Sequence, residues 1–478
     1  MVVIGAGVGG LSAAALLLKA GYPVTVLEAH IYPGGSAGTF YHQGYRFDAG
    51  ATLAGGFAPG GPHARLADLL GLEWPVQPVD PAWVVHLGGR KVTQWSNRAQ
   101  WQDEFQSHFP ESAPFLGKQE RLAGLAWDVS SRPFPWPPSS PSDLLLLLAA
   151  LRPATLLAAP YALQTVASLL PPDASPLLRT FVDAQLLISA QTGAQQANAL
   201  YGSAAFDLPR RGVNHVHGGI GSLAATLADW IKANGGQVIY RQQVEQIVAR
   251  AGRAVAVRTR KGLELPCDIL LANLTPWGLA GLLNGTTPAR LKREVAKRPP
   301  TWGAFTLYLG LESSALGQPA SDHFQVVADP DQPLGEGNSV FISLSPQDDP
   351  CRAPFGMRAA TLSTHTVVKD WELSEDAYQA RRAAMADTLL SAAEIALPGL
   401  RSATRLQLDG TPRAFAFFTR RPGGMVGGFP QTSLLRVRGP WSGLPNLWLV
   451  GDSIFPGQST AGVTLGALRV AAEVMRRA

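Results

Sequence analysis

The feature that most constrains this chain is a glycine-rich run close to its N-terminus, Gly5-Ala6-Gly7-Val8-Gly9-Gly10. An apolar segment, Val2-Val3-Ile4, precedes the run, and a segment rich in Ala and Leu follows it, so the pattern predicts a strand, a tight turn and a helix. In that context, backbone N–H groups and the helix N-terminus face an incoming pyrophosphate, and the missing Cβ atoms let it approach. The run therefore predicts a dinucleotide-binding βαβ unit.

An acidic residue stands where the second strand of this unit is expected to end. The strand is predicted over residues 24–27, and Glu28 follows it directly. A carboxylate at this position accepts hydrogen bonds from ribose hydroxyls, and it would repel a 2′-phosphate. The bound nucleotide is therefore expected to carry free ribose hydroxyls, as FAD and NAD do.

Two further segments favour FAD over NAD. A second glycine pair, in Pro33-Gly34-Gly35-Ser36, follows the acidic residue, and a chain without side chains there can pass beside the ribityl-pyrophosphate of an extended dinucleotide. Near the other end of the chain, Asp452 stands at the tip of a strand predicted over residues 447–450, where it is placed to bind ribityl hydroxyls. The final helix opens shortly afterwards, and its N-terminus would stabilise negative charge on the pyrimidine ring of a reduced flavin.

Three patterned blocks of sequence must meet to complete one sheet. The second block contains a helix predicted over residues 222–233 and a buried strand predicted over 267–273, and the third contains the C-terminal strand and helix. The expected fold class is therefore mixed α/β, with a discontinuous Rossmann-like FAD-binding domain and an inserted substrate-binding domain of sheet and apolar helices. The expected FAD-binding segments are residues 1–75, 206–285 and 406–478, and the expected substrate-binding segments are residues 76–205 and 286–405.

Composition excludes several classes of protein. Only 16% of the 478 residues are charged, against about 25% in ordinary globular domains, which indicates apolar surface kept for something besides the core. The basic residues are scattered, so no nucleic-acid partner is expected.

Cys267 and Cys351 form no C-x-x-C motif, which fits a reducing cytoplasm. His215 and His217 lack a third ligand nearby, so no metal site is expected.

The longest apolar stretch runs from Leu144 to Leu170 and is interrupted at Arg152-Pro153 and at Pro160. A transmembrane helix needs about 20 uninterrupted apolar residues, so two short apolar helices are predicted in place of a membrane span. Two interpretations of these helices stay open, which are internal packing and peripheral contact with a membrane surface.

Taken together, the motifs resemble those of a known family. GAGVGG, LEA, PGGSAG, GYRFDAG, HGGIGSLAATLADWIKANGG and NLWLVGDSIFPGQSTAGVTLGALRVA are similar to the carotenoid desaturase and isomerase group of the FAD-dependent amine-oxidase-like superfamily. The segments FDAGATLAGGFAPGGPHARL and GDSIFPGQS look most similar to the bacterial carotenoid 3,4-desaturases. Ser36 stands where the superfamily often has Arg. In this respect the chain resembles the isomerase-like branch, which also lacks that Arg. The resemblance implies that Val244 presents its backbone to the adenine.

The resemblance implies FAD-dependent desaturation, of the C-3,4 type, of an acyclic or 1-hydroxy-carotenoid end in carotenoid biosynthesis. It also implies an electron acceptor such as a quinone or oxygen. A flavin-dependent carotenoid cis/trans isomerase is one alternative, and a non-catalytic lipid carrier on the same fold is another. No residue identifies itself as a base, so the catalytic residues stay unassigned. The residues expected to bind FAD are Gly5, Gly7, Gly10, Glu28, Gly34, Gly35, Ser36, Gly50, Ala51, Thr52, Val244, Gly451, Asp452, Gly462 and Val463.

Overall fold

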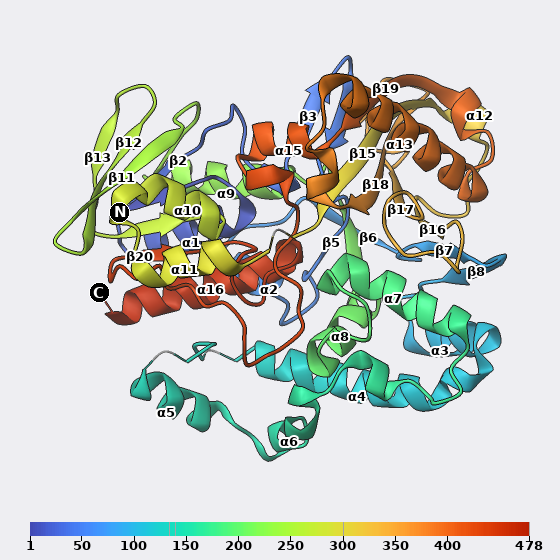
Figure 1. Ribbon diagram of the computed structural model, residues 1–478, viewed down its shortest axis with the longest axis horizontal. Helices are drawn as coiled ribbons and strands as arrows, with labels where there is room; N and C mark the ends of the chain where they lie inside the picture. Colours follow the sequence, from blue (N-terminus) through green and yellow to red (C-terminus); the bar gives the residue numbers. More distant parts are fainter. Residues whose placement is uncertain (133, 139, 300, 478) are drawn as a thin grey trace.

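A parallel sheet of five strands forms the part of the molecule that contains both chain termini (Figure 1). The computed structural model describes residues 1–132, 134–138, 140–299 and 301–477. Because Ile4 lies in register with Leu27 and with Ala272, and Ala272 with Leu449, the carboxyl ends of four strands meet at one edge. In spatial order the strands are β10 (Gln237–Ile239), β2 (Thr25–Leu27), β1 (Val2–Ile4), β14 (Leu270–Ala272) and β20 (Leu447–Leu449).

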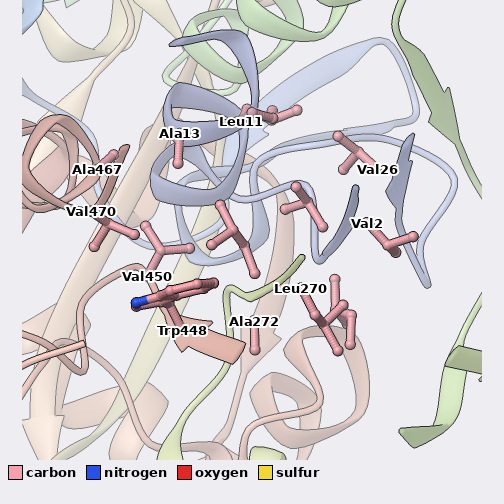
Figure 2. Close-up of a cluster of buried hydrophobic side chains, with 14 of the residues drawn as sticks. Val2, Leu11, Ala13, Val26, Leu270, Ala272, Trp448, Val450, Ala467 and Val470 are labelled. Atoms are coloured by element: carbon pink, nitrogen blue, oxygen red, sulfur yellow. The ribbon is translucent and has the colours of Figure 1, made fainter. Parts of the chain in front are cut away.

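Helices α1 (Val8–Lys19), α9 (Ser222–Ala233) and α16 (Ser459–Arg477) pack around this sheet, and α1 contacts both of the others. The helix predicted over residues 222–233 is confirmed, whereas the strands predicted over 24–27, 267–273 and 447–450 are shorter than expected. Figure 2 shows the apolar interior that these elements share. Its labelled side chains are Val2, Leu11, Ala13, Val26, Leu270, Ala272, Trp448, Val450, Ala467 and Val470.

A second, mixed sheet of seven strands lies beside the first region, and the long helix α13 (Glu375–Ala396) packs on it (Figure 1). One of its edge strands, β19 (Thr404–Gly410), crosses the boundary expected between residues 405 and 406. This strand pairs with β15 (Gly303–Glu312), which belongs to the inserted segment. The two sheets with their helices confirm the mixed α/β class. In spatial order the strands are β19 (Thr404–Gly410), β15 (Gly303–Glu312), β18 (Met357–Thr366), β17 (Ser339–Leu344), β16 (His323–Val327), β7 (Val84–Leu87) and β8 (Arg90–Thr93).

Smaller elements complete the two regions. The remaining strands are β3 (Thr39–His42), β4 (Tyr45–Asp48), β5 (Ala54–Gly55), β6 (Val76–Val79), β9 (Val213–Val216), β11 (Val244–Arg250), β12 (Arg253–Thr259) and β13 (Glu264–Pro266). The remaining helices are α2 (Pro62–Leu70), α3 (Arg98–His108), α4 (Ala113–Ser130), α5 (Pro141–Ala150), α6 (Pro153–Leu156), α7 (Pro176–Ala190), α8 (Ala199–Phe206), α10 (Pro276–Leu283), α11 (Ala289–Lys297), α12 (Ser313–Leu316), α14 (Leu400–Ala403) and α15 (Pro412–Thr419).

Helices α5 and α6 lie at the lower edge of the molecule, away from both sheets (Figure 1). Large apolar side chains stand exposed on them, including Leu145 at 68%, Leu148 at 62% and Leu157, directly after α6, at 66%. Within the described ranges, no single helix is long and apolar enough to span a membrane. Helix α5 and the segment Pro153–Leu163 together reach that length as a pair bent by 107°.

Candidate active site

The glycine turn after β1 is packed so closely that side chains do not fit in it. Gly5 has a φ of +91°, a conformation that L-residues with a Cβ rarely adopt. A Cβ on Gly7 would lie 2.4 Å from Asn273 Nδ2, and a Cβ on Gly10 would lie 2.4 Å from the carbonyl oxygen of Gly5. No side chain caps the N-terminus of α1, which begins directly after Gly7, so its first N–H groups are free to bind an anion.

The carboxylate of Glu28 ties the glycine turn to the second strand. One oxygen accepts a hydrogen bond from the backbone N–H of Ala6 at 2.7 Å, and the other accepts one from His30 N–H at 2.8 Å. Burial raises the pKa of Glu28, and these backbone hydrogen bonds oppose that shift. The side chain therefore already holds the turn in shape, besides being at the strand end where a ribose is expected.

Asn273 lies between the two glycine turns, and sequence reasoning did not identify it. It follows β14 directly, and the backbones of Gly9 and Gly451 approach it so closely that a Cβ on Gly451 would lie 2.4 Å from Asn273 Oδ1. A Cβ on Gly9 would in turn lie 2.9 Å from the Cα of Gly451. The sequence signal that could have identified Asn273 was its place at the end of a predicted buried strand, because residues that follow neighbouring parallel strands meet at one edge of a sheet.

Asp452 forms an ion pair that the sequence did not reveal. Nη1 of Arg421 donates to Oδ2 of Asp452 at 2.7 Å, and Nη2 donates to the carbonyl oxygen of Gly427 at 2.7 Å. Arg421 follows α15, so it joins a segment beside the seven-stranded sheet to the loop after β20. This contact fixes the orientation of a carboxylate that faces the cavity.

A cavity of about 850 Å³ brings most of the predicted site residues together. It passes along the glycine turn after β1, the loop after β4 and the N-terminus of α16. The predicted residues that line it are Gly7, Gly34, Gly35, Ser36, Gly50, Ala51, Thr52, Gly451, Asp452, Gly462 and Val463.

Four predicted residues, Gly5, Gly10, Glu28 and Val244, are not among the residues that line this cavity. Gly5 and Gly10 shape the turn, as described above. Val244 begins β11, two residues after Gln242, whose backbone N–H donates to the carbonyl oxygen of Glu28 at 2.8 Å.

The cavity continues from these turns into an apolar arm. Side chains from the helical region and from the seven-stranded sheet line this arm, and Leu147, Leu151 and Leu156 line it where it passes α5 and α6. The same two helices expose other leucines on their outer surface. Large apolar residues elsewhere in the lining include Trp83, Leu125, Trp127, Phe134, Trp136, Ile188, Phe341, Leu434 and Phe455.

Part of the cavity wall is polar although it is buried. The amide of Gln191 lies 3.3 Å from Nε2 of His365, and burial lowers the pKa of His365 to about 4, so its ring is neutral near pH 7. Within the described part of the chain, Gln191 Oε1 and Gln458 Nε2 have no hydrogen-bond partner. These side chains offer hydrogen bonds to whatever fills the cavity. Sequence reasoning missed Gln191 because its segment carries no motif, and it quoted the motif that contains Gln458 without giving that side chain a role.

The residues around the turns fit an extended dinucleotide. Two helix N-termini, those of α1 and α16, reach the same cavity, and the glycines between them leave room for backbone contact with a pyrophosphate. The half-buried carboxylate of Glu28 stands at the end of β2, and that of Asp452 faces the cavity after β20. These donors and acceptors are of the kind that bind a flavin dinucleotide.

Comparisons with known proteins agree with this geometry. The family described as flavin containing amine oxidoreductase matches residues 8–475. Prolycopene isomerase from Daucus carota is 28% identical over 99% of this chain and 80% of its own length. The neurosporene-forming phytoene desaturase of Rhodobacter capsulatus is 25% identical over 97% of this chain and 91% of its own.

Solved structures share the fold at low sequence identity. An oxidoreductase from Methanosarcina mazei superposes with a TM-score of 0.67 at 18% identity, covering 98% of this chain and 99% of its own. Putrescine oxidase bound to putrescine gives a TM-score of 0.65 at 17% identity, covering 99% and 98% of the two chains. The chain is an oxidoreductase with FAD as its cofactor, and it belongs to the family of flavin-containing amine oxidoreductases.

Proposed function

We propose that this protein desaturates a carotenoid with FAD as the oxidant. The observation that carries the proposal is one cavity that is lined both by the dinucleotide turns and by the apolar side chains of the arm. A hydrocarbon polyene offers no charge for recognition, so an apolar channel is the kind of site that binds it. The names of relatives support this substrate class, because they include prolycopene isomerases, a diapophytoene desaturase and a phytoene desaturase.

In this proposal the predicted site residues hold the cofactor from one end to the other. The N–H groups beyond Gly7 bind the pyrophosphate, Glu28 accepts from the ribose hydroxyls, and Val244 presents its backbone to the adenine. Asp452, oriented by Arg421, accepts from the ribityl chain, and the N-terminus of α16 at Gly462 and Val463 faces the pyrimidine ring. Bound FAD supplies a hydride acceptor, and the apolar arm orients the substrate and excludes water.

We also propose the domain division expected from the sequence, with one adjustment. The five-stranded sheet draws its strands from residues 1–75, 206–285 and 406–478, which supports one discontinuous FAD-binding domain. Residues 76–205 and 286–405 form the substrate-binding domain in this proposal. Strand β19 belongs with the latter because it pairs with β15.

A carotenoid cis/trans isomerase is the second candidate, and a specific observation favours it. The prolycopene isomerases match this chain at 26–28% identity, slightly above the 23–25% of the desaturases. Desaturation releases two hydrogens and isomerisation releases none, so product mass separates the two. Purified holoprotein incubated with lycopene-type and 1-hydroxy-carotenoids, with a quinone or oxygen as acceptor, is expected to give a product lighter by two hydrogens. A product of unchanged mass would assign the isomerase.

A non-catalytic lipid carrier is disfavoured by the cofactor site itself. Glu28 accepts two backbone hydrogen bonds that shape the turn, and Asp452 is held by Arg421 towards the cavity. A protein that only carried a lipid would have no use for this arrangement, in which tight glycine turns, the half-buried Glu28 and the oriented Asp452 lie around one cavity.

We further propose that α5 and α6 rest on a membrane surface, from which an apolar substrate enters. Leu145, Leu148 and Leu157 are exposed, while Leu147 and Leu151 of the same region line the cavity. Leu151 is also 39% exposed, so the cavity wall at this helix pair lies close to the outer surface. Arg152, between the helices, is 66% exposed and is placed to reach lipid headgroups.

Changing Leu145, Leu148 and Leu157 together to serine is expected to reduce cosedimentation with anionic liposomes several-fold, because it removes exposed apolar side chains from the contact surface. The measurement is the bound fraction of yellow, folded protein. The matched control changes Ile31, Tyr41 and Leu435 to serine, since these are equally exposed but lie outside α5 and α6. Equal loss of binding in both variants, or no liposome binding by wild type, would contradict the membrane proposal.

A further inference from the structure

A chain of hydrogen bonds leads from the cavity wall into the seven-stranded sheet. Thr52, in the loop after β4, lines the cavity, and its Oγ1 lies 2.6 Å from Oγ of Ser343. Oγ of Ser343 lies 2.9 Å from Nδ1 of His323. Ser343 on β17 and His323 on β16 are direct cross-strand partners, so the sheet register itself brings these two groups together.

The chain then approaches the protein surface. His323 is 1% exposed, and the centroid of its ring lies 4.6 Å from that of His215 on β9. Nε2 of His215 lies 3.4 Å from Oδ2 of Asp322, whose side chain is 33% exposed. Arg358 holds the same carboxylate at 2.5 Å. Within the described part of the chain, Nε2 of His323 has no hydrogen-bond partner, although the atom is buried.

Burial keeps the ring of His323 neutral, and the net effect of the charges around it is in the same direction. Burial lowers the pKa of His323 well below its ordinary value, the neighbouring His215, Arg358 and Arg352 lower it further, and Asp322 opposes them. A neutral imidazole has one nitrogen that accepts and one that donates a proton. That is the state in which a histidine passes a proton on without retaining it.

Packing alone does not require polar groups at this position. The next pair on the same face of these two strands is Gln325 and Phe341, so an apolar side chain is accommodated there, and the buried amide of Gln325 has its partners in Gln185 and the carbonyl oxygen of Ala184. Burying two hydroxyls and an imidazole is costly, and leaving Nε2 of His323 unpaired adds to that cost. A hydrogen-bonded chain that ends at a wall of the cavity is therefore unexplained by the stability of the sheet.

We propose that Thr52, Ser343 and His323 form the route by which the proton released in desaturation leaves the cavity. The inference rests on the proposed function. When one substrate carbon has lost a hydride to FAD, the C–H bond of its neighbour becomes acidic, and the electron pair of that bond becomes the new double bond. The proton passes to Oγ1 of Thr52, each hydroxyl hands its own proton onward, and Nδ1 of His323 is protonated.

The ring of His323 then completes the transfer. Nε2 gives up its proton towards His215 and the partly exposed Asp322, so one proton enters the chain and one leaves it. In this scheme a rotation of either ring completes the step between the two histidines, whose ring centroids are 4.6 Å apart. Ser343 and His323 act through Thr52 and are positioning residues in this scheme.

The test is anaerobic, single-turnover reduction of the holoprotein by its carotenoid substrate, followed by flavin absorbance across pH in H2O and in D2O. Ser343→Ala interrupts the chain and is expected to slow flavin reduction by about tenfold or more and to change its pH and isotope dependence. Ser343→Thr retains the hydroxyl and is expected to restore the wild-type profile. His323→Gln interrupts the chain at a second point and is expected to repeat the effect of Ser343→Ala.

Ser345→Ala is the matched control. Its hydroxyl is also buried at the end of β17, but it accepts a hydrogen bond from Ala359 N–H at 3.1 Å and does not join the chain. Wild-type rates and an unchanged isotope effect in both Ser343→Ala and His323→Gln would overturn the route and leave desaturation intact. Wild-type protein whose flavin is never reduced by a carotenoid would overturn both proposals at once.

Discussion

Replacing Gly7 with valine is expected to give folded protein that is colourless because it no longer holds FAD. A Cβ at this position would lie 2.4 Å from Nδ2 of Asn273, and Gly7 lines the cavity at the N-terminus of α1. The added side chain would displace Asn273 and fill the space that a pyrophosphate needs. The measurement is the visible flavin absorbance of the purified protein, together with the FAD released when the protein is denatured.

Gly281→Val is the control for Gly7→Val. Gly281 lies in α10, and a Cβ there would meet no atom within 4 Å, so this variant is expected to stay yellow. Circular dichroism of both variants separates loss of cofactor from loss of fold. Normal FAD content in Gly7→Val would show that the pyrophosphate does not lie at this turn.

Replacing Glu28 with alanine is expected to weaken FAD binding by about 1.5–3 kcal/mol, because it removes a charged acceptor of hydrogen bonds from the ribose. It also leaves the backbone N–H groups of Ala6 and His30 without their partner, so the melting temperature of the apoprotein is expected to fall. Glu28→Gln keeps one carbonyl oxygen and is expected to lose less on both measures. Titration of apoprotein with FAD and thermal unfolding measure the two effects.

Glu245→Ala is the matched control, since Glu245 is an exposed carboxylate on β11 that pairs with Arg260 at 3.5 Å. Once saturated with FAD, Glu28→Ala is expected to turn over, because the carboxylate is distant from the reacting carbons in the proposed arrangement. Unchanged FAD affinity together with a lowered melting temperature would mean that Glu28 serves the turn alone and binds no ribose.

The parts of the fold that could be predicted from the sequence are those in which local pattern and chemistry coincide. The first βαβ unit combines an apolar strand, glycines and a helix within a few residues, and the helix Ser222–Ala233 has an equally clear apolar periodicity. The sequence also predicted that β1, β14 and β20 lie in one sheet, because short buried strands from separate segments must complete one parallel sheet.

The parts that could not be predicted depend on distant pairing. Arg421 meets Asp452 only because α15 folds back beside the loop after β20, and no local pattern announces that contact. Ser343 and His323 come together through the register of two antiparallel strands. The alternation of polar and apolar residues along these strands does not distinguish them from other strands of a sheet with one polar face. Asn273 was within reach of sequence reasoning, because it follows a strand that ends at the same edge as the glycine turn.

Anaerobic addition of a carotenoid to the oxidised holoprotein tests the account most directly. Desaturation must pass two electrons into FAD, so the flavin is expected to bleach in proportion to the product formed. The product is expected to be lighter by two hydrogens and to absorb at longer wavelength, because its conjugation is extended. Turnover that requires flavin reduced beforehand, with no bleaching and a product of unchanged mass, would contradict the desaturase and leave the fold and the cofactor as described.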